Sequence, residues 1–365
     1  MTICDYAPAH IRAIAPYEPG KPISELAREM QLEESSIIKL ASNENPLGVS
    51  RKAQEAIRAV LSDVGRYPDG NGFELKHALE RRYGVPKAGI VLGNGSNDVL
   101  DLAARAFLTS TDEAIYSRHA FAVYPLAVQA LGARGIEVPA QKFGHDVAAM
   151  HAAITAQTRL VFIANPNNPT GTFVSGDILE GFLSKVPPHV LVVLDEAYNE
   201  YLPEGARTDT LPWLKRYPNL VITRTFSKVY GLAGLRVGYA FAAPAVADLM
   251  NRVREPFNVN SVALAAAAAA LEDHDFVRES YELNLRGMKQ LTEGFAKLKL
   301  DYIPSYGNFV TFKVHNARDV FQSLLKQGVI VRPLGGYAMP DHLRVTVGLE
   351  TENARFLESL ARAIE

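Results

Sequence analysis

Residues 225–238 read TFSKVYGLAGLRVG and continue the apolar run that begins at Leu220. The β-branched and apolar content of that run predicts a buried strand, and the glycines after it predict a turn. Lys228 therefore lies where a buried strand ends, so its amine must lose water or find a partner, and lysines in such places are often reactive. The alternative is a surface lysine in an ordinary strand-to-loop turn, and Lys228 alone leaves both interpretations open.

Short apolar runs alternate with segments of helical periodicity on both sides of this stretch. We expect strands at 90–92, 113–116, 160–164, 190–194, 220–225 and 236–241. We expect helices between them at 51–60, 72–83, 96–108, 123–131 and 176–185. This order is typical of an α/β protein whose sheet has many parallel strands.

The pattern changes from about residue 251. A long helical stretch runs to 298, followed by a strand at 309–313, a helix at 317–327 and strands near 329 and 343. Helices set against a smaller mixed sheet predict a second domain. We therefore expect an N-terminal arm with part of the small domain at 1–45, a large domain at 46–255 and a small C-terminal domain at 256–365. The arm is a poor helix before Ile23 because of Pro8, Pro16, Pro19, Gly20 and Pro22.

Composition excludes several classes of protein. Hydrophobic residues make up 48% of the 365 residues and charged residues 21%, and the formal net charge is −2, so no bulk charge favours nucleic acid or a membrane surface. The alanine run 265–270 is too short to span a bilayer, and the first ten residues do not resemble a secretory signal. Cys4 is the only cysteine, which fits a reducing compartment, and we expect a cytoplasmic protein.

A carboxylate and a phenol follow a second apolar run. Asp195 closes the run 190–194, and Tyr198 comes three residues later. A buried carboxylate is costly without a cationic partner, and Tyr198 is close enough to share its pocket. The alternative is that Asp195 caps the next helix and Tyr198 simply packs.

Two loops complete the set of polar elements. The segment 165–171 reads NPNNPTG directly after a strand, at the edge where open α/β sheets place ligands. The segment 93–98 reads GNGSND and leads from a strand into a helix, so backbone N–H groups near Gly95 could hold a phosphate. Each loop by itself is also compatible with ordinary turn chemistry.

Taken together, the four elements resemble the fold type I pyridoxal 5′-phosphate (PLP) aminotransferases, over essentially the whole chain. The order is Gly-Ser-Asn, Asn-Asn-Pro-Thr-Gly, Asp-x-x-Tyr, then Ser-Lys with an arginine eight residues later. The resemblance implies a large domain with a mostly parallel seven-stranded sheet between helices, plus a smaller α+β domain. It implies PLP as cofactor and no metal, with a phosphate site of Gly95, Ser96, Asn97, Ser227 and Arg236, ring contacts from Asn168, Asp195 and Tyr198, and Lys228 as the Schiff-base lysine.

Within this family the chain is similar to the histidinol-phosphate aminotransferases. The matching segments are 16–21 (PYEPGK), 40–46 (LASNENP, which contains Asn43), 66–69 (RYPD), 308–309 (NF), 331–333 (VRP) and 343–348 (LRVTVG). The resemblance implies that Tyr67 reaches the cofactor phosphate of a neighbouring subunit, and hence a homodimer with shared active sites.

One segment departs from the family pattern. The aromatic residue that stacks on the cofactor usually follows Pro-Thr or Pro-Ser, whereas this chain reads Arg118-His119-Ala120-Phe121. Phe121 can still stack on a pyridine face. We expect His119 to be packed or solvated rather than catalytic.

The resemblance also implies the course of the reaction. Lys228 moves the proton that leaves the substrate carbon, Asp195 keeps the ring nitrogen protonated, and 2-oxoglutarate accepts the amino group in a ping-pong cycle. Arg332 and Arg344 are the candidate anion ligands, because a guanidinium binds phosphate or carboxylate in a forked geometry. Tyr17 and Asn43 complete the candidate substrate site. The alternative for Arg332 is an ordinary surface ion pair.

Three other functions compete with this hypothesis. An aromatic amino acid aminotransferase needs a similar anion site and pocket. A decarboxylase or β-lyase of the same fold uses the same cofactor but breaks another bond. A PLP-sensing regulator requires an additional basic DNA-binding module, for which the segment before Tyr17 leaves no room.

Overall fold

The computed structural model describes residues 2–17 and 19–365. Met1 and Glu18 lie outside the described residues, so the structure says nothing of Glu18 in the segment 16–21. No helix in these described ranges is long and apolar enough to cross a membrane.

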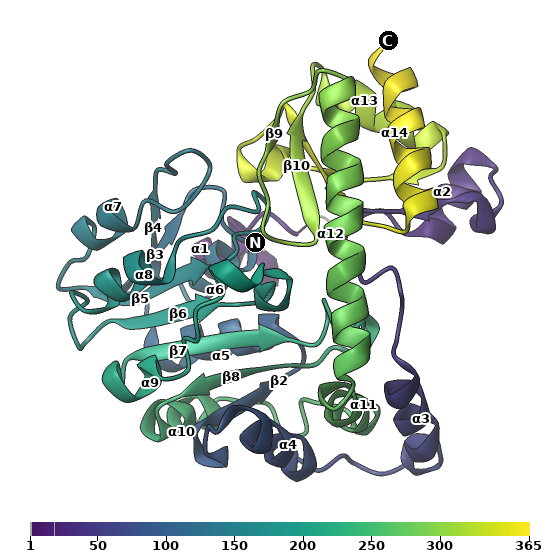
Figure 1. The fold of residues 1–365 in the computed structure, drawn as a ribbon. Helices are drawn as coiled ribbons and strands as arrows, with labels where there is room; N and C mark the ends of the chain where they lie inside the picture. Colours follow the sequence, from purple (N-terminus) through teal and green to yellow (C-terminus); the bar gives the residue numbers. More distant parts are fainter. Residues whose placement is uncertain (1, 18) are drawn as a thin grey trace.

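A seven-stranded sheet forms the centre of the larger part of the molecule (Figure 1). Its strands lie in the order β2-β8-β7-β6-β5-β3-β4. Only β8 runs antiparallel to its neighbours, so the expected mostly parallel sheet is confirmed. The strands are β2 (Ile90–Gly93), β3 (Glu113–Ser117), β4 (Arg134–Val138), β5 (Thr158–Ala164), β6 (Leu191–Asp195), β7 (Leu220–Thr225) and β8 (Gly238–Ala242).

Helices cover both faces of this sheet, as the buried side chains show. Alternate residues such as Phe162 and Val193 pack on one face against α5 (Ser96–Phe107), α6 (Val123–Ala130) and α10 (Pro244–Arg252). Their neighbours Val161 and Val192 pack on the other face against α7 (Val147–Ala152), α8 (Gly176–Leu183) and α9 (Trp213–Arg216). Strands buried on both faces are near-continuous apolar runs, which is why the sequence predicted them.

Two details of the large sheet differ from the expectation. Strand β4 was not predicted, because this edge strand exposes Arg134, Gly135 and Glu137 and so has no apolar run. Strand β8 begins at Gly238 rather than at Arg236, whose backbone is left-handed with φ 58°.

The smaller part is built on a four-stranded antiparallel sheet in the order β12-β13-β10-β9. The helices α12 (His274–Lys297), α13 (Ala317–Lys326) and α14 (Glu350–Ile364) pack on it through residues such as Leu291, Phe295 and Phe356. Its strands are β9 (Tyr302–Ile303), β10 (Phe309–Lys313), β12 (Arg332–Pro333) and β13 (His342–Thr346).

The helical stretch that was expected from about 251 through 298 is interrupted twice. Helix α10 ends at Arg252, and residues 253–260 are not helical. Helix α11 (Ser261–Leu271) ends before Glu272, and α12 begins at His274. Asp273 caps α12, because its carboxylate accepts a hydrogen bond from the Phe276 amide at 3.4 Å. Helix α11 packs against α3 (Arg51–Val60) and α4 (Phe73–Tyr83), whereas α12 extends from there to the smaller sheet (Figure 1).

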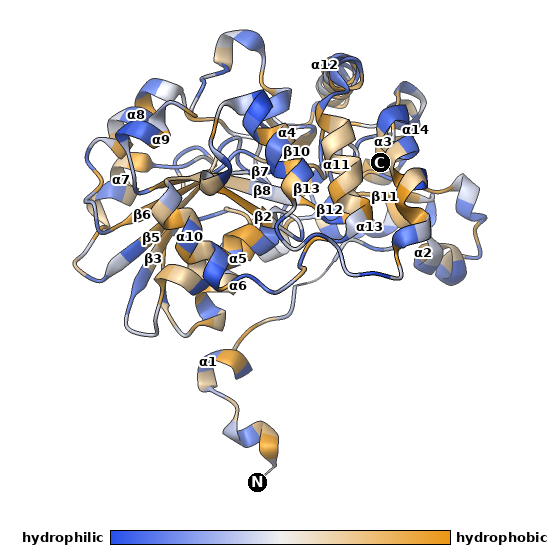
Figure 2. Ribbon diagram, turned by 90° about the horizontal axis from the view of Figure 1, so that it is seen from below, coloured by the Kyte–Doolittle hydropathy of each residue, from blue (hydrophilic) through white to orange (hydrophobic). Residues whose placement is uncertain are grey.

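The N-terminal segment crosses between the two parts. Helix α1 (Ala9–Arg12) projects from the body of the molecule in Figure 2, and it contacts α6. Helix α2 (Ile23–Met30) begins at Ile23, as expected, and β1 (Ile38–Lys39) pairs in parallel with β11 (Val329–Ile330) of the smaller part. The division at 45 and 255 stays a proposal.

Candidate active site

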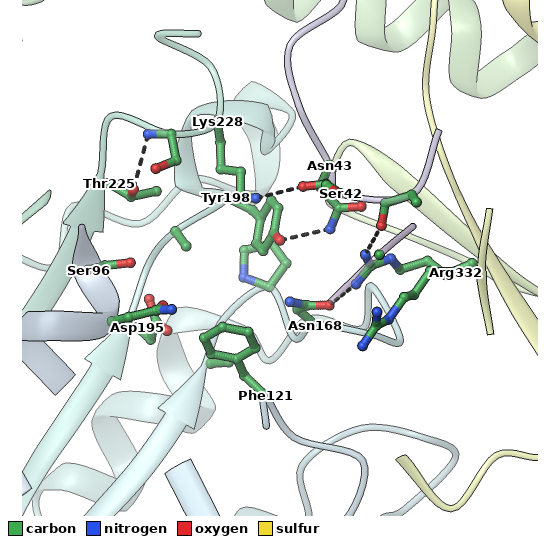
Figure 3. Close-up of a pocket in the computed structure, with 18 of the residues that line it drawn as sticks. Ser42, Asn43, Ser96, Phe121, Asn168, Asp195, Tyr198, Thr225, Lys228 and Arg332 are labelled. Atoms are coloured by element: carbon green, nitrogen blue, oxygen red, sulfur yellow. Dashed lines mark hydrogen bonds between the residues drawn. The ribbon is translucent and has the colours of Figure 1, made fainter. Parts of the chain in front are cut away.

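A pocket opens where three parallel strands of the large sheet end. Ala164, Asp195 and Thr225 are the last residues of β5, β6 and β7, and all three line it. The carboxyl edge of an open α/β sheet is where ligands commonly bind. Arg332 and Arg344 reach the same pocket from the smaller part, so both parts build one site (Figure 3).

Lys228 projects into this pocket from the tight turn after β7 (Figure 3). The turn is closed by Gly231, whose amide donates to the Lys228 carbonyl at 3.0 Å and whose φ is 70°. The Lys228 amine donates to the carbonyl of Ser42 at 3.1 Å. Burial, with a further contribution from Arg344, lowers the pKa of Lys228 to about 7. A lysine with this pKa gains and loses a proton near neutrality.

Asp195 lies deep in the pocket and is held by two hydroxyl groups. Tyr124 donates to one carboxylate oxygen at 2.8 Å, and Thr223 donates to the other at 3.0 Å. Burial raises the pKa of Asp195, while these hydrogen bonds oppose the rise by favouring the ionised form. Only 5% of Asp195 is exposed, so a charged carboxylate here requires a cation from a ligand.

The side chains of Tyr198 and Asn43 contact each other in the pocket (Figure 3). The Asn43 amide donates to the Tyr198 hydroxyl at 2.9 Å. Burial raises the pKa of Tyr198 to about 12, although the nearby Arg344 opposes the rise. The phenol is therefore neutral near pH 7 and can still donate its own proton to a ligand oxygen.

A candidate anion cradle lies at the start of α5. No side chain caps this helix, so the amides of Ser96 and Asn97 belong to the first turn, where N–H groups lack partners within the helix. A Cβ atom on Gly238 would lie 2.4 Å from the Ser96 nitrogen, and one on Gly95 would lie 2.3 Å from Arg236 Nη2. Glycine is required at 238 because the neighbouring atom is backbone, and at 95 because φ is 85°, whereas the end of the Arg236 side chain could move aside. Arg236 Nη1 also donates to the Ser227 hydroxyl at 3.4 Å.

Two arginines face each other across the small sheet. Arg332 and Arg344 are direct partners in the pairing of β12 with β13. Arg344 is buried and donates to the side chain of Asn168 and to the Ala41 carbonyl, the latter at 2.7 Å. The guanidinium of Arg332 lies 5.3 Å from the ring centre of Tyr17. Like charges directly opposite each other destabilise a sheet, so this pair favours an anion between them.

Phe121 lies on the opposite side of the pocket from Lys228 (Figure 3). Its ring makes an edge contact with Tyr124, with ring centres 5.9 Å apart. The position suits an aromatic residue that covers one face of a planar ligand.

Most of the candidate residues named from the sequence line this pocket. Two do not. Gly95 lies behind Arg236, and Tyr67 is 83% exposed and stacks on Phe257 with ring centres 4.8 Å apart. The lining candidates are Tyr17, Asn43, Ser96, Asn97, Phe121, Asn168, Asp195, Tyr198, Ser227, Lys228, Arg236, Arg332 and Arg344.

Two further residues of the site, Tyr124 and Tyr337, were not predicted from the sequence. Tyr124 is the second residue of α6, and nothing in the helical pattern indicates that its hydroxyl reaches Asp195. Tyr337 follows two glycines, in a segment between Arg332 and Arg344. This Gly-Gly-aromatic turn was the one local sequence signal for a pocket wall. In the described part of the chain, no group of three or more His, Cys, Asp or Glu side chains could hold a metal ion.

Comparison of the sequence with known families and proteins gives a consistent result. The family described as "Aminotransferase class I and II" matches residues 35–360. A protein named histidinol-phosphate aminotransferase 2, from Nitrosospira multiformis, is 62% identical over 100% of this chain and 93% of its own length. A histidinol-phosphate aminotransferase from Methylobacillus flagellatus is 63% identical over 99% of this chain and 98% of its own.

Solved structures share the fold. The crystal structure of histidinol-phosphate aminotransferase from Sinorhizobium meliloti in complex with pyridoxal 5′-phosphate has a TM-score of 0.88 and 27% identity, covering 98% of this chain and 96% of that one. Aspartate aminotransferase from Thermus thermophilus with maleate has a TM-score of 0.82 over 97% of this chain and 98% of its own. At 24% identity the second likeness shows the fold alone.

Proposed function

This chain belongs to the class I and II aminotransferase family, and we propose that within it the protein is a histidinol-phosphate aminotransferase. It transfers the amino group of L-histidinol phosphate to 2-oxoglutarate and forms imidazole acetol phosphate and L-glutamate, a step of histidine biosynthesis. The observation that carries this substrate is the facing pair Arg332 and Arg344, which provides two cations for a phosphate. The names of the relatives at 62% and 63% identity support the same choice.

The pocket fits pyridoxal 5′-phosphate as the cofactor. Asp195 is a buried carboxylate that needs a cation, and a protonated pyridine nitrogen is one. Ser96 and Asn97 at the start of α5, with Ser227 and Arg236, suit the phosphate. Bound there, the cofactor contributes an aldehyde that condenses with amines and a ring that accepts electrons.

Lys228 acts in this site as the amine that binds the cofactor and as the base. Its pKa of about 7 allows Nζ to take the proton from the substrate carbon and return it at neutral pH. Asp195 holds the proton on the ring nitrogen, Tyr198 and Asn168 bind the ring oxygen, and Phe121 covers one ring face. Each of these side chains reaches the pocket without rearrangement of the backbone.

One anion site serves both substrates. Histidinol phosphate carries its phosphate where an amino acid carries its carboxylate, so Arg332 and Arg344 bind the phosphate in one half-reaction and a carboxylate of 2-oxoglutarate in the other. Tyr17 packs on Arg332, and Asn43 links Tyr198 to the same wall of the pocket. The two substrates therefore bind in turn, and because the enzyme retains the amino group between the half-reactions, we expect ping-pong kinetics.

We also propose a homodimer in the cytoplasm. The exposed ring of Tyr67 stacks on that of Phe257, which is 45% exposed, and forms an apolar surface. Large exposed apolar side chains that lie together mark interaction surfaces. In the dimer Tyr67 completes the phosphate site of the neighbouring subunit.

The test is a comparison of kcat/KM for histidinol phosphate and phenylalanine, with 2-oxoglutarate as acceptor and glutamate as the measured product. We expect a clear preference for the phosphate ester. An equal or higher value for phenylalanine would overturn the substrate and favour an aromatic amino acid aminotransferase. Consumption of histidinol phosphate without glutamate would indicate a lyase or decarboxylase.

A further inference from the structure

The side chain of His119 forms a hydrogen bond to the backbone of Tyr337. It lies between β3 and α6, two residues before Phe121, and its Nδ1 is 2.6 Å from the carbonyl oxygen of Tyr337. A carbonyl oxygen can only accept, so Nδ1 carries the hydrogen and donates it. Tyr337 belongs to the short turn between β12 and β13, the two strands that carry Arg332 and Arg344.

The His119 end of this bond is held in place. The backbone of His119 is left-handed, with φ 59°. Its carbonyl oxygen accepts a hydrogen bond from the side chain of Asn167 at 3.1 Å. Asn167 is 1% exposed and precedes Asn168, whose side chain contacts Arg344.

The Tyr337 end is equally fixed. The ring is 8% exposed and packs with Ile303, Leu334 and Met339, and Ala122 of the large part packs against this group. The Tyr337 amide donates to the Leu334 carbonyl at 2.9 Å. The hydrogen bond therefore joins two ordered segments that are 218 residues apart in the sequence and that both build the pocket.

We propose that His119 is a positioning residue, which ties the turn at Tyr337 to the segment of Phe121 and so sets the distance from the arginine pair to the cofactor site. His119 does not line the pocket that holds Lys228, so it acts through these neighbours rather than on substrate. The inference rests on the proposed function, since the arginines bind the substrate anion in that proposal. Hydrogen bonds weaken steeply outside their preferred geometry, so arginines that move from their place bind the substrate anion less tightly.

Two variants separate the donor from the backbone conformation. His119→Gly accepts the left-handed backbone but lacks the donor, whereas His119→Asn accepts it and offers an amide N–H near the place of Nδ1. In the PLP-loaded enzyme we expect His119→Gly to raise KM for histidinol phosphate and for 2-oxoglutarate roughly tenfold, with a smaller effect on kcat. His119→Asn should restore most of both KM values, and the visible spectrum without substrate should match that of the wild type in both variants.

Amide hydrogen exchange of residues 335–341, without substrate, gives a second measurement that does not depend on substrate identity. Exchange should be faster in His119→Gly and near the wild-type rate in His119→Asn. Unchanged KM or unchanged exchange in the glycine variant overturns the inference, and so does equal loss in both variants. If the wild-type enzyme does not act on histidinol phosphate, the proposed function fails, and the exchange comparison then decides the role of His119 by itself.

Discussion

Asp195 is a buried carboxylate on which burial and hydrogen bonding act in opposite directions. Burial raises its pKa, and the hydroxyls of Tyr124 and Thr223 oppose the rise with one hydrogen bond to each oxygen. Two neutral donors stabilise the charge without cancelling it, so the carboxylate still attracts a ligand cation. Burial favours the neutral form of Lys228 as well, and in a base this lowers the pKa.

We expect Tyr124→Phe to move the acid limb of the kcat/KM profile to higher pH. The variant loses a hydrogen bond that favours the ionised carboxylate, so the pKa of Asp195 rises and protonation begins at a higher pH. The pH profile is measured with the PLP-loaded enzyme, because kcat/KM reports the pKa values of groups in the enzyme before substrate binds. Thr223→Val removes the other donor and should shift the limb in the same direction; a limb displaced to lower pH would contradict the assignment.

Lys228→Met should change how the stability of the cofactor-free protein depends on pH. The folded pKa is about 7 against an ordinary value of 10.5, so between these values the unfolded chain binds more protons and stability rises with pH. The variant lacks this slope. Its advantage in Tm over the wild type should therefore be greatest near pH 7 and shrink toward pH 10, and a difference that stays constant over this window would refute the low pKa.

Secondary-structure elements bring positively charged groups and helix N–H groups together in the pocket. Strands β12 and β13 place Arg332 opposite Arg344, and the first turn of α5 faces Arg236. Both arrangements are unfavourable without an anion. Both places therefore favour a negative charge, which in the proposed function is the substrate anion at one and the cofactor phosphate at the other.

Arg332→Gln should stabilise the protein without ligand and weaken substrate binding. Relief of the repulsion with Arg344 is worth about 0.2–1 kcal/mol, a small rise in Tm. Loss of one charged donor to the phosphate should raise KM for histidinol phosphate roughly tenfold to a hundredfold. Arg286→Gln, at an exposed position in the middle of α12, is the matched control and should change neither value. A fall in Tm with unchanged KM would show that Arg332 is structural.

Gly238→Ala should weaken both folding and cofactor binding. The new methyl group would lie 2.4 Å from the Ser96 nitrogen, so the start of α5 must move, at a cost of about 1–3 kcal/mol. Gly181→Ala in α8 is the control, because nothing lies within 4 Å of its added Cβ and alanine favours the helix by about 0.5–1 kcal/mol. Denaturant unfolding and PLP titration measure the two effects, and normal PLP affinity in Gly238→Ala would contradict the role of this contact.

At the scale of the whole molecule, the active site lies between two parts that each fold around their own core. The large sheet contributes Lys228 and Asp195, and the small sheet contributes both arginines. Contacts such as Lys228 to Ser42 and Arg344 to Ala41 show that the segment after α2 also seals the pocket. The relative position of the two parts is therefore part of the substrate site.

Mixing two inactive variants tests the shared sites of the proposed dimer. Lys228→Ala lacks the amine, and Tyr67→Ala lacks the ring that reaches the neighbouring site. In a mixed dimer one site carries both defects and the other carries none, so unfolding and refolding an equal mixture should restore about a quarter of the wild-type rate. No recovery, with dimers present by light scattering, would contradict a contribution from Tyr67 across the interface.

Much of the fold followed from local sequence alone. The strands at β5, β6 and β7 were predicted because they are buried on both faces and so are apolar throughout. Strand β4 was missed because its exposed residues are polar, and the break before α12 was missed because Asp273 acts as a cap within a continuous helical pattern. Whether a segment forms an edge strand or caps a helix depends on the elements that pack beside it, and the local sequence does not show these.

The residue types of the pocket could be predicted from the amino-acid order, because Lys228, Asp195 and Asn168 lie at strand ends, and parallel strands bring their ends to one edge. The contacts that tune these residues are visible only in the folded chain. The hydroxyl of Tyr124 on Asp195, the register that opposes Arg332 to Arg344, and the hydrogen bond from His119 to Tyr337 join residues far apart in the chain. Such contacts leave no periodic signal, because they arise from the packing of one element on another rather than from any single element.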